Sequence, residues 1–397
     1  MRYERACIPL GACWSSPFAR WQGPLAEVSS LDLAVLVTRR ALADRGIPAE
    51  AVTQLVLGWT VPQAGAFYGA PTVAARIGAV GVTGPMVSQA CATSVAAVAL
   101  AANAIEAGDR GLHLVVLTDR TSNGPHIVYP MPSSQGGAPL AEDWVLENFR
   151  CDPWAGRSML ETAESVAAEL GVAREELDEV TALRYEQYAR ALAEDRRFQR
   201  RYMVPVEVPA RKGPPTVVEA DVGVRPTTLD DLRGLAPAIP DGLHTFGTQT
   251  HPADGAAGCL VTTEDRAREL ARGEGVVRIL ASGFARVGKA EMPKAPVPAA
   301  EAALADAGLS FGDLDAVTTH NPFAVNDLWF SRKTGVPLER MNGYGCSLVY
   351  GHPQAPTGAR AIAELVETLR ERGGGVGLFT GCAAGDTGGA LVLRVED

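Results

Sequence analysis

The chain repeats one pattern of apolar and polar positions in its two halves. The segment ALADRGI at 41–47 recurs as ALADAGL at 303–309, an offset of 262 positions with five of seven residues identical. In each copy a glycine follows an apolar helical pattern, and a short loop leads into an apolar strand, at 55–58 and at 314–320. This order is typical of an α/β unit, so we predict a helix followed by a strand in both places.

A second pair of segments favours duplication of the whole pattern. Residues 91–119 begin as a loop and continue as an apolar helix, a glycine-containing break and a strand, and residues 352–382 follow the same order. Two matches in one order and nearly one register predict an internal repeat rather than a chance likeness between alanine-rich helices. The stretch between the halves has proline-rich and charged segments and a helical pattern at 173–200, and we interpret it as an inserted domain.

Composition then narrows the class of protein. Of the 397 residues 47% are hydrophobic and 21% charged, which is an ordinary globular composition with material for more than one core. The net charge of −10 argues against a nucleic-acid-binding protein. The chain shows neither a signal-peptide pattern nor an apolar run of about 18 residues, so we expect no membrane span. Seven cysteines without a close CxxC pair indicate a cytoplasmic protein without a metal site.

One cysteine is a candidate nucleophile. A predicted strand that ends near Ser88 leads into a long apolar helix that starts close to Cys91. At a helix N-terminus, unpaired backbone N–H groups and the positive end of the dipole stabilise a thiolate, and they can also bind a developing oxyanion. A buried packing cysteine fits the same segment, so the neighbouring chemistry has to distinguish the two.

Three further residues offer that chemistry. His352 lies between a glycine and a proline before a predicted helix, within one or two positions of the internal counterpart of Cys91. Equivalent loops of two pseudosymmetric halves can meet, so His352 is a candidate base for Cys91. Cys382 precedes a glycine-rich loop and could act as acid or base, and His320 ends the second predicted strand. For each of the three, the alternative is a structural role in a turn.

Together these segments resemble the thiolase family over essentially the whole chain. CATS at 91–94 is similar to the family's nucleophile segment, GHPQAPTGAR at 351–360 to its GHPxGxSGAR loop, and CAA at 382–384 to its CxG loop. The resemblance implies a thiolase fold, an α/β protein whose two duplicated α/β halves form a layered αβαβα arrangement with an inserted loop domain.

The implied domains are an N-terminal half at 1–119, an inserted loop domain that binds substrate and CoA at 120–247, and the remainder of the first half with the C-terminal half at 248–397.

The resemblance also implies an activity and a set of site residues. A thiolase-type acyltransferase makes or cleaves the C–C bond of a 3-ketoacyl-CoA through an acyl-cysteine. It uses acyl-CoA and CoA as substrates without a further cofactor, and it works as a homodimer or homotetramer. The implied catalytic residues are the nucleophile Cys91, its base His352, the second base Cys382 and the hydrogen-bond donor His320. The implied oxyanion hole is the backbone N–H groups of Cys91 and Ala384, and the implied CoA contacts are Arg225, Thr250, Ser158 and Met159.

Several positions depart from the family pattern. HNPF stands at 320–323 in place of NEAF or HEAF, and Ser158 replaces a histidine. Tyr350 and Cys346 stand where small residues are common, which favours a larger or differently shaped acyl pocket. Two alternatives therefore stay open: a condensing enzyme of a biosynthetic pathway with an unusual acyl donor, and a catalytically silent homologue with a binding or structural role.

Overall fold

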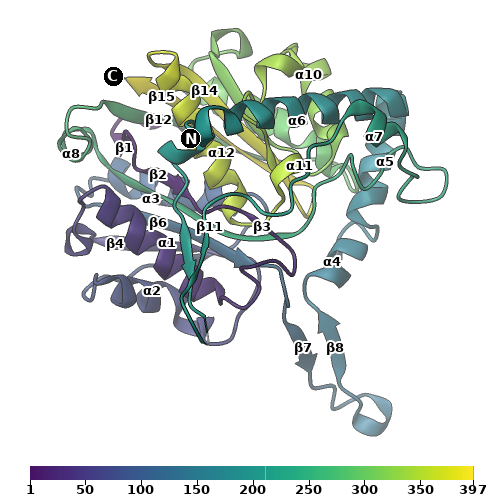
Figure 1. The fold of residues 1–397 in the computed structure, drawn as a ribbon, viewed down its shortest axis with the longest axis horizontal. Helices are drawn as coiled ribbons and strands as arrows, with labels where there is room; N and C mark the ends of the chain where they lie inside the picture. Colours follow the sequence, from purple (N-terminus) through teal and green to yellow (C-terminus); the bar gives the residue numbers. More distant parts are fainter. Residues whose placement is uncertain (211, 397) are drawn as a thin grey trace.

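Eleven of the described strands form one hydrogen-bonded sheet with two matching halves (Figure 1), and the remaining four form two separate two-stranded sheets. The computed structural model describes residues 1–210 and 212–396. The first half contains, in spatial order, β5 (Met86–Val87), β4 (Gln54–Gly58), β6 (His113–Arg120) and β11 (Ala253–Thr263). The second contains β13 (Ala316–His320), β14 (Gly375–Ala383), β15 (Thr387–Glu396) and β12 (Val276–Arg286). β1 (Ala6–Pro9) pairs with both β11 and β12 and joins the halves, while β2 (Cys13–Ser15) and β3 (Ala19–Arg20) pair with β11.

Strand directions confirm the predicted duplication. β4 runs parallel to β6 as β13 runs parallel to β14. β6 is antiparallel to β11 as β14 is antiparallel to β15. β1 lies antiparallel beside β11 as β12 lies beside β15. The two halves therefore share one strand order and one set of directions.

Helices cover these strands in layers. α3 (Thr93–Glu106) and α12 (Pro356–Glu371) pack against each other and form the central layer, α3 on β4, β6 and β11 and α12 on β13 and β14. α1 (Ser30–Asp44) and α2 (Gly69–Ile77) cover the first half on the outside, with α1 on β6 and β11. α9 (Pro296–Ala307) covers β12, β14 and β15, α10 (Ala324–Thr334) packs beside it, and α8 (Glu264–Leu270) lies against β1. This is the expected αβαβα order.

The local sequence explains where the repeated helices end. α1 begins where the side chain of Ser29 accepts a hydrogen bond from the backbone N–H of Asp32. Gly46 after α1 has a φ of 62°, and Gly308 after α9 has a φ of 69°. Glycine adopts this left-handed conformation without steric cost, so both copies of the repeat stop at the same point.

The two central helices approach each other closely at their N-terminal ends. A Cβ atom at Gly358 would lie 2.9 Å from the Cβ of Ser94, so this crossing requires a glycine. The hydroxyl of Ser94 donates to the carbonyl of Ala355 and accepts from the N–H of Ala359 at 2.8 Å. These contacts hold the loop before α3 next to the loop before α12.

A long insertion separates β6 from β11 and includes the region interpreted above as an inserted domain. It contains β7 (His126–Tyr129), β8 (Leu140–Asp143), α4 (Leu146–Arg150), α5 (Met159–Leu170), α6 (Arg174–Arg196), β9 (Val206–Val208), β10 (Thr216–Val218) and α7 (Leu229–Arg233). The β7–β8 hairpin projects from the body, and α6 lies along the second half (Figure 1). α6 packs on α10 and α11 (Ser347–Tyr350), and a buried ion pair joins Arg184 Nε of α6 to Asp327 Oδ2 of α10 at 2.8 Å. The insertion is therefore fastened to the half that carries His352.

In the part of the chain that the structure describes, no helix has both the length and the apolar character needed to cross a membrane. All seven cysteines are free thiols.

Candidate active site

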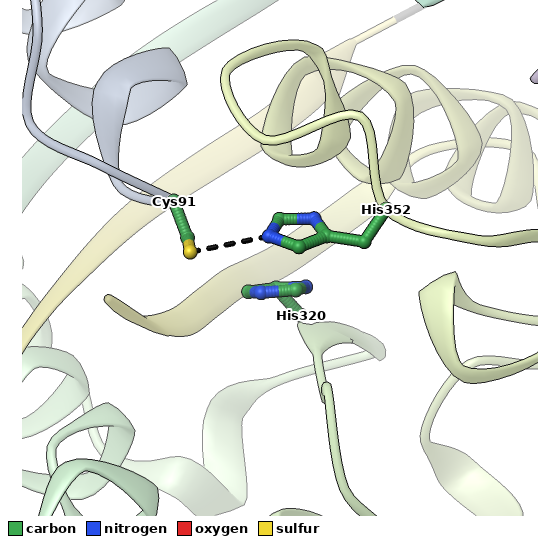
Figure 2. Close-up of side chains that lie close together, drawn as sticks. All are labelled: Cys91, His320 and His352. Atoms are coloured by element: carbon green, nitrogen blue, oxygen red, sulfur yellow. Dashed lines mark hydrogen bonds between the residues drawn. The ribbon is translucent and has the colours of Figure 1, made fainter. Parts of the chain in front are cut away.

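Cys91 and His352 meet where the two central helices begin (Figure 2). Cys91 stands just before α3 and His352 just before α12, and the Sγ of Cys91 lies 3.1 Å from the Nε2 of His352. The other ring nitrogen of His352, Nδ1, lies 2.6 Å from the hydroxyl of Thr357. The backbone N–H of His352 donates to the carbonyl of His251 at 2.9 Å. Contacts on both sides thus aim the free Nε2 of His352 at the sulfur, as a nucleophile and its base require.

His320 lies flat against His352. The ring centroids are 4.1 Å apart at an interplanar angle of 28°, and Figure 2 shows the two rings stacked beside Cys91. The Nδ1 of His320 is 2.9 Å from the hydroxyl of Ser347, whereas its Nε2 is buried and has no hydrogen-bond partner among the described residues. The Ser347 hydroxyl also lies 3.3 Å from the Oδ1 of Asn321, an alternative acceptor for its proton. In the tautomer in which this hydroxyl donates to the nearer Nδ1, the proton of neutral His320 is on Nε2, free to donate to a ligand.

Cys382 ends a core strand on the other side of the site. It is the penultimate residue of β14, fully buried, and its Sγ accepts a hydrogen bond from the side-chain amide of Asn326 at 3.3 Å. Burial first, and then the nearby Cys91 sulfur, raise the pKa of Cys382 well above its ordinary value. The structure therefore brings all four predicted catalytic residues to one place.

Burial keeps these groups uncharged. It raises the pKa of Cys91 to about 11, against the opposing effect of two backbone N–H groups, those of Ala384 and of Cys91 itself, that bond to the sulfur. It lowers the pKa of His352 well below its ordinary value and that of His320 to about 3. All these shifts have the direction expected for desolvation. These directions describe a resting pair made of a neutral thiol beside a neutral imidazole.

Cys91, His320 and His352 are also residue types that bind metal ions. The ligand atoms of Cys91, His320 and His352 all lie within 4.8 Å of one another. A zinc ion needs ring lone pairs that converge on it in the plane of each ring. Two rings stacked at 28° direct their lone pairs nearly side by side, so this arrangement suits proton transfer better than coordination.

A cavity of about 250 Å³ opens beside the sulfur. Its lining residues are Thr60, Val61, Ser88, Ala90, Glu142, Trp144, Val145, Asn148, Phe149, Met159, Gln354 and Ala384. Most of the large apolar side chains come from the insertion, whereas Ala90, Gln354 and Ala384 adjoin the catalytic groups. The cavity thus combines large apolar side chains with a few polar groups, as small-molecule sites commonly do, and through Gln354 it reaches the neighbourhood of Cys91.

The four residues expected to contact CoA have different surroundings. Met159 lines the cavity, while Ser158 caps α5 in a capping box with Glu161. Thr250 bonds the HNPF loop through its N–H to the carbonyl of Pro322 at 2.7 Å, and its hydroxyl donates to the carbonyl of Ser347 at 2.6 Å. Arg225 lies exposed on the insertion.

Tyr350, expected from its sequence position to change the acyl pocket, is not among the residues that line this cavity. Its ring packs under the guanidinium of Arg360 at 3.6 Å and edge-on to Phe18, and its hydroxyl donates to Glu364 at 3.0 Å. The bulk of Tyr350 is taken up by a buried polar cluster between α12 and the insertion, and Cys346 is likewise buried in the core.

Sequence reasoning missed several residues that contact the catalytic groups: Thr357, Ser347, Asn326 and Gln354. Thr357 occupies the serine position of the GHPxGxSGAR pattern, so its presence was visible. The other three had no such signal, because their roles depend on which way a side chain points across loops that are far apart in sequence.

Comparisons with known proteins agree along the whole chain. Residues 12–265 match the family model for the thiolase N-terminal domain, and residues 274–395 match the model for the thiolase C-terminal domain. The chain is 32% identical over 380 residues to an acetyl-CoA acetyltransferase of Pseudomonas aeruginosa, covering 94% of this chain and 95% of that protein. It is 32% identical over 425 residues to a 3-ketoacyl-CoA thiolase of Salmonella choleraesuis, covering 96% and 95% of the two chains.

A solved structure shares the fold. The crystal structure of human mitochondrial 3-ketoacyl-CoA thiolase in complex with CoA superimposes with a TM-score of 0.90 at 25% identity and covers 100% of both chains. Family models that match both halves, relatives that align over nearly the full length and a common fold lead to one conclusion: this chain belongs to the thiolase family and is a thiolase-type acyltransferase.

Proposed function

We propose that the enzyme makes or cleaves the C–C bond of a 3-ketoacyl-CoA in two steps through an acyl-Cys91 intermediate. The observation that carries this proposal is the 3.1 Å contact between the Cys91 sulfur and His352 Nε2, with Cys382 and His320 beside it. A covalent intermediate divides one difficult carbon–carbon step into two acyl transfers.

In the first step the thiol proton of Cys91 passes to His352 while the sulfur attacks the thioester carbonyl. The carbon–sulfur bond to CoA breaks, and the departing CoA thiolate takes the proton of the Cys382 thiol. The products are acyl-Cys91, free CoA, a Cys382 thiolate and a His352 imidazolium. The raised pKa of Cys382 means that this thiolate is a strong base once it forms.

In the second step the Cys382 thiolate removes an α-proton from another acyl-CoA. The resulting carbanion attacks the acyl carbon, and the Cys91 sulfur leaves and recovers its proton from His352. All three side chains are then as they began, and thiolytic cleavage is the same path reversed.

Both steps place negative charge on a thioester oxygen, so each needs hydrogen-bond donors. The backbone N–H groups of Cys91 and Ala384, which already bond to the sulfur, are the donors we propose for the acyl-enzyme oxygen. For the enolate oxygen we propose His352 together with the unpartnered Nε2 of His320.

We further propose CoA thioesters as the substrates, with no other cofactor. The structural relative described above is a complex with CoA, which supports this choice. Met159 would contact the acyl or pantetheine portion, and Ser158, Thr250 and Arg225 the remainder of CoA. Because the reaction needs Cys91 and Cys382 as free thiols, we place it in a reducing compartment such as the cytoplasm.

A homodimer or homotetramer is the assembly we propose. β5 stands at the open edge of the sheet, and Phe67, Tyr68 and Val80 expose 85%, 69% and 79% of their surfaces on the same half. An open edge beside exposed apolar side chains supports association with a second copy. Light scattering of the full chain tests this assignment, and a monomer would contradict it.

The test of the activity is acylation. The protein is incubated with a panel of acyl-CoAs, and the Cys91 peptide is examined for the acyl mass increment. Cys382→Ala should still acylate yet fail to form the carbon–carbon bond. If no acyl-CoA labels Cys91 under conditions that label a known thiolase, the proposal fails. That result would favour the alternative of a catalytically silent homologue with a binding or structural role. Acylation of the wild type without condensation would favour an acyltransferase with an unusual acyl donor.

A further inference from the structure

Gln354 contacts the nucleophile in an unusual backbone conformation. It occupies the variable position of GHPxGxSGAR, and its Oε1 lies 3.4 Å from the Cys91 sulfur. Its φ is 59°, a left-handed value. This conformation is unfavourable for residues other than glycine, because the side chain crowds the backbone. Such strain persists where the surroundings hold a residue firmly, and it is concentrated at functional sites.

The surroundings of Gln354 do hold it. Its carbonyl accepts from the N–H of Thr357 at 3.1 Å, and the next N–H, of Ala355, donates to the buried carboxylate of Asp119 at 3.0 Å. Asp119 also accepts from the N–H groups of Thr60 and Val61, which line the cavity. The side chain of Gln354 is thus fixed against one wall of the cavity.

One end of this side chain lacks a partner. Gln354 is 7% exposed and lines the cavity, yet its Nε2 has no hydrogen-bond partner among the described residues. A buried amide N–H without an acceptor costs about 1–3 kcal/mol, so a ligand that supplies an acceptor is favoured over one that does not. Because Nε2 and Oε1 share one carbon, this donor lies within a few ångströms of the reacting sulfur.

The position of the donor limits what the acceptor can be. The carbonyl oxygen of the acyl-enzyme has two proposed donors already, the backbone N–H groups of Cys91 and Ala384. The amide of Gln354 therefore remains for a second oxygen close to the thioester. Glu142 stands in the same cavity, and its carboxylate disfavours an acyl group that itself carries a negative charge.

We infer that Gln354 is a specificity-determining residue that selects acyl groups with an uncharged oxygen acceptor attached to the first or second carbon beyond the carbonyl carbon, such as a hydroxyl, ether or keto oxygen. This inference rests on the proposed acylation of Cys91. The cavity of about 250 Å³ fits a short acyl group of this kind.

Isosteric acyl donors test the inference. Butanoyl-CoA is compared with methoxyacetyl-CoA, and pentanoyl-CoA with 3-methoxypropanoyl-CoA, because each pair differs only in the exchange of one CH₂ for oxygen. The single-turnover rate of Cys91 acylation is followed by the mass of the Cys91 peptide. The selectivity ratio is the acylation rate with the oxygen compound divided by the acylation rate with its carbon partner. Intrinsic thioester reactivity affects wild type and variant equally, so it cancels when their selectivity ratios are compared.

Two variants remove the amide in different ways. Gln354→Met keeps the length of the side chain, and Gln354→Gly suits the left-handed backbone and so protects folding. Gln22→Met is the matched control, because Gln22 has a φ of 57° but is exposed and bonds to Asn123. For at least one pair, both Gln354 variants should lower the selectivity ratio about three- to tenfold, the loss of one neutral hydrogen bond. Gln22→Met should keep the wild-type ratio.

The outcomes separate the inference from the proposed function. If the wild type acylates with all four donors and the Gln354 variants keep its ratio for both pairs, the thiolase function stands and the role of Gln354 is refuted. If other acyl-CoAs label Cys91 but none of these four does, the proposed function stands and the role of Gln354 is refuted. If no acyl-CoA labels Cys91, the proposed function fails and the inference fails with it.

Discussion

Replacement of His320 by asparagine should change how stability depends on pH. His320 is 1% exposed, and burial lowers its pKa to about 3 from an ordinary value of 6.5. Between these values the unfolded chain binds a proton at this residue and the folded chain does not, so His320 destabilises the fold increasingly as the pH falls below 6.5. At pH 4.5, two units below the unfolded value, the loss is about 2–3 kcal/mol relative to neutral pH, at about 1.4 kcal/mol per unit.

His320→Asn removes this proton-binding site and keeps a polar group toward Ser347. The free energy of unfolding is measured by urea denaturation at pH 7 and at pH 4.5, with tryptophan fluorescence as the probe. The stability of the variant relative to the wild type should rise by about 2–3 kcal/mol between pH 7 and pH 4.5. His126→Asn, at an exposed position of β7, is the control. Its free energy of unfolding relative to the wild type should be the same at both pH values.

A relative stability of His320→Asn that does not change with pH would refute the reasoning. It would mean that folded His320 accepts a proton as readily as the unfolded chain does. A neutral His320 that donates from Nε2 to an enolate oxygen would then be untenable at acidic pH.

Three further predictions concern Cys91, the buried Arg360 and the helix crossing at Gly358. Burial raises the pKa of Cys91 to about 11, so the rate at which iodoacetamide alkylates Cys91 should rise about tenfold per pH unit from pH 7 to pH 9. Peptide mass spectrometry measures this rate. A plateau near neutral pH would indicate a preformed thiolate and contradict the prediction. Asp221→Asn deprives the buried Arg360 of carboxylate contacts at 2.6 and 2.7 Å and should lower the free energy of unfolding in urea by about 3–5 kcal/mol. Asp44→Asn is the control, because it breaks the exposed pair of Arg40 and Asp44, and it should lower the free energy of unfolding by only about 0.5 kcal/mol. Equal losses for Asp221→Asn and Asp44→Asn would contradict a stabilising role of the buried ion pair. Gly358→Ala should lower the free energy of unfolding by about 1–3 kcal/mol and slow acylation, because the new Cβ would lie 2.9 Å from Ser94. Gly312→Ala is the control and should be nearly neutral, because a Cβ there would lie 3.6 Å from its nearest contact. Equal stability of the two variants would argue against the close helix crossing.

The repeat was predictable because its signal is local. ALADRGI and ALADAGL each combine the end of an apolar helical face with a glycine, and an apolar strand pattern follows a few residues later, so that α1, β4, α9 and β13 can be predicted without reference to the rest of the chain. The helix after Cys91 was equally visible, since α3 begins two residues later at Thr93. The capping box of Ser158 and Glu161 was also legible as the pattern S-x-x-E before an apolar run, although the family resemblance directed attention to CoA instead.

The shape of the site was not predictable in this way. The stacking of His320 on His352 depends on how closely α12 approaches the end of β13, and no periodicity of the sequence encodes that distance. Trp144 and Phe149 line the cavity from short elements of the insertion, where neither helical nor strand periodicity marks an inward face. Tyr350 shows the opposite error: its size at a position usually small predicted a changed pocket, but Arg360 and Phe18 provide a separate place for the ring.

Burial links the reactivity of this site to its selectivity. Desolvation keeps Cys91 and His352 neutral in the free enzyme, so the charges that catalysis needs arise only when substrate is present. The same desolvation leaves two donors, His320 Nε2 and Gln354 Nε2, without partners in the described part of the chain. In a site of low polarity each unpaired donor is costly, and each substrate oxygen that meets one gains more than it would in water. In the two-step reaction proposed above, Gln354 pairs an oxygen of the acyl donor in the first step and His320 pairs the enolate oxygen in the second, so the choice of acyl group and the carbanion chemistry both depend on burial of the same site.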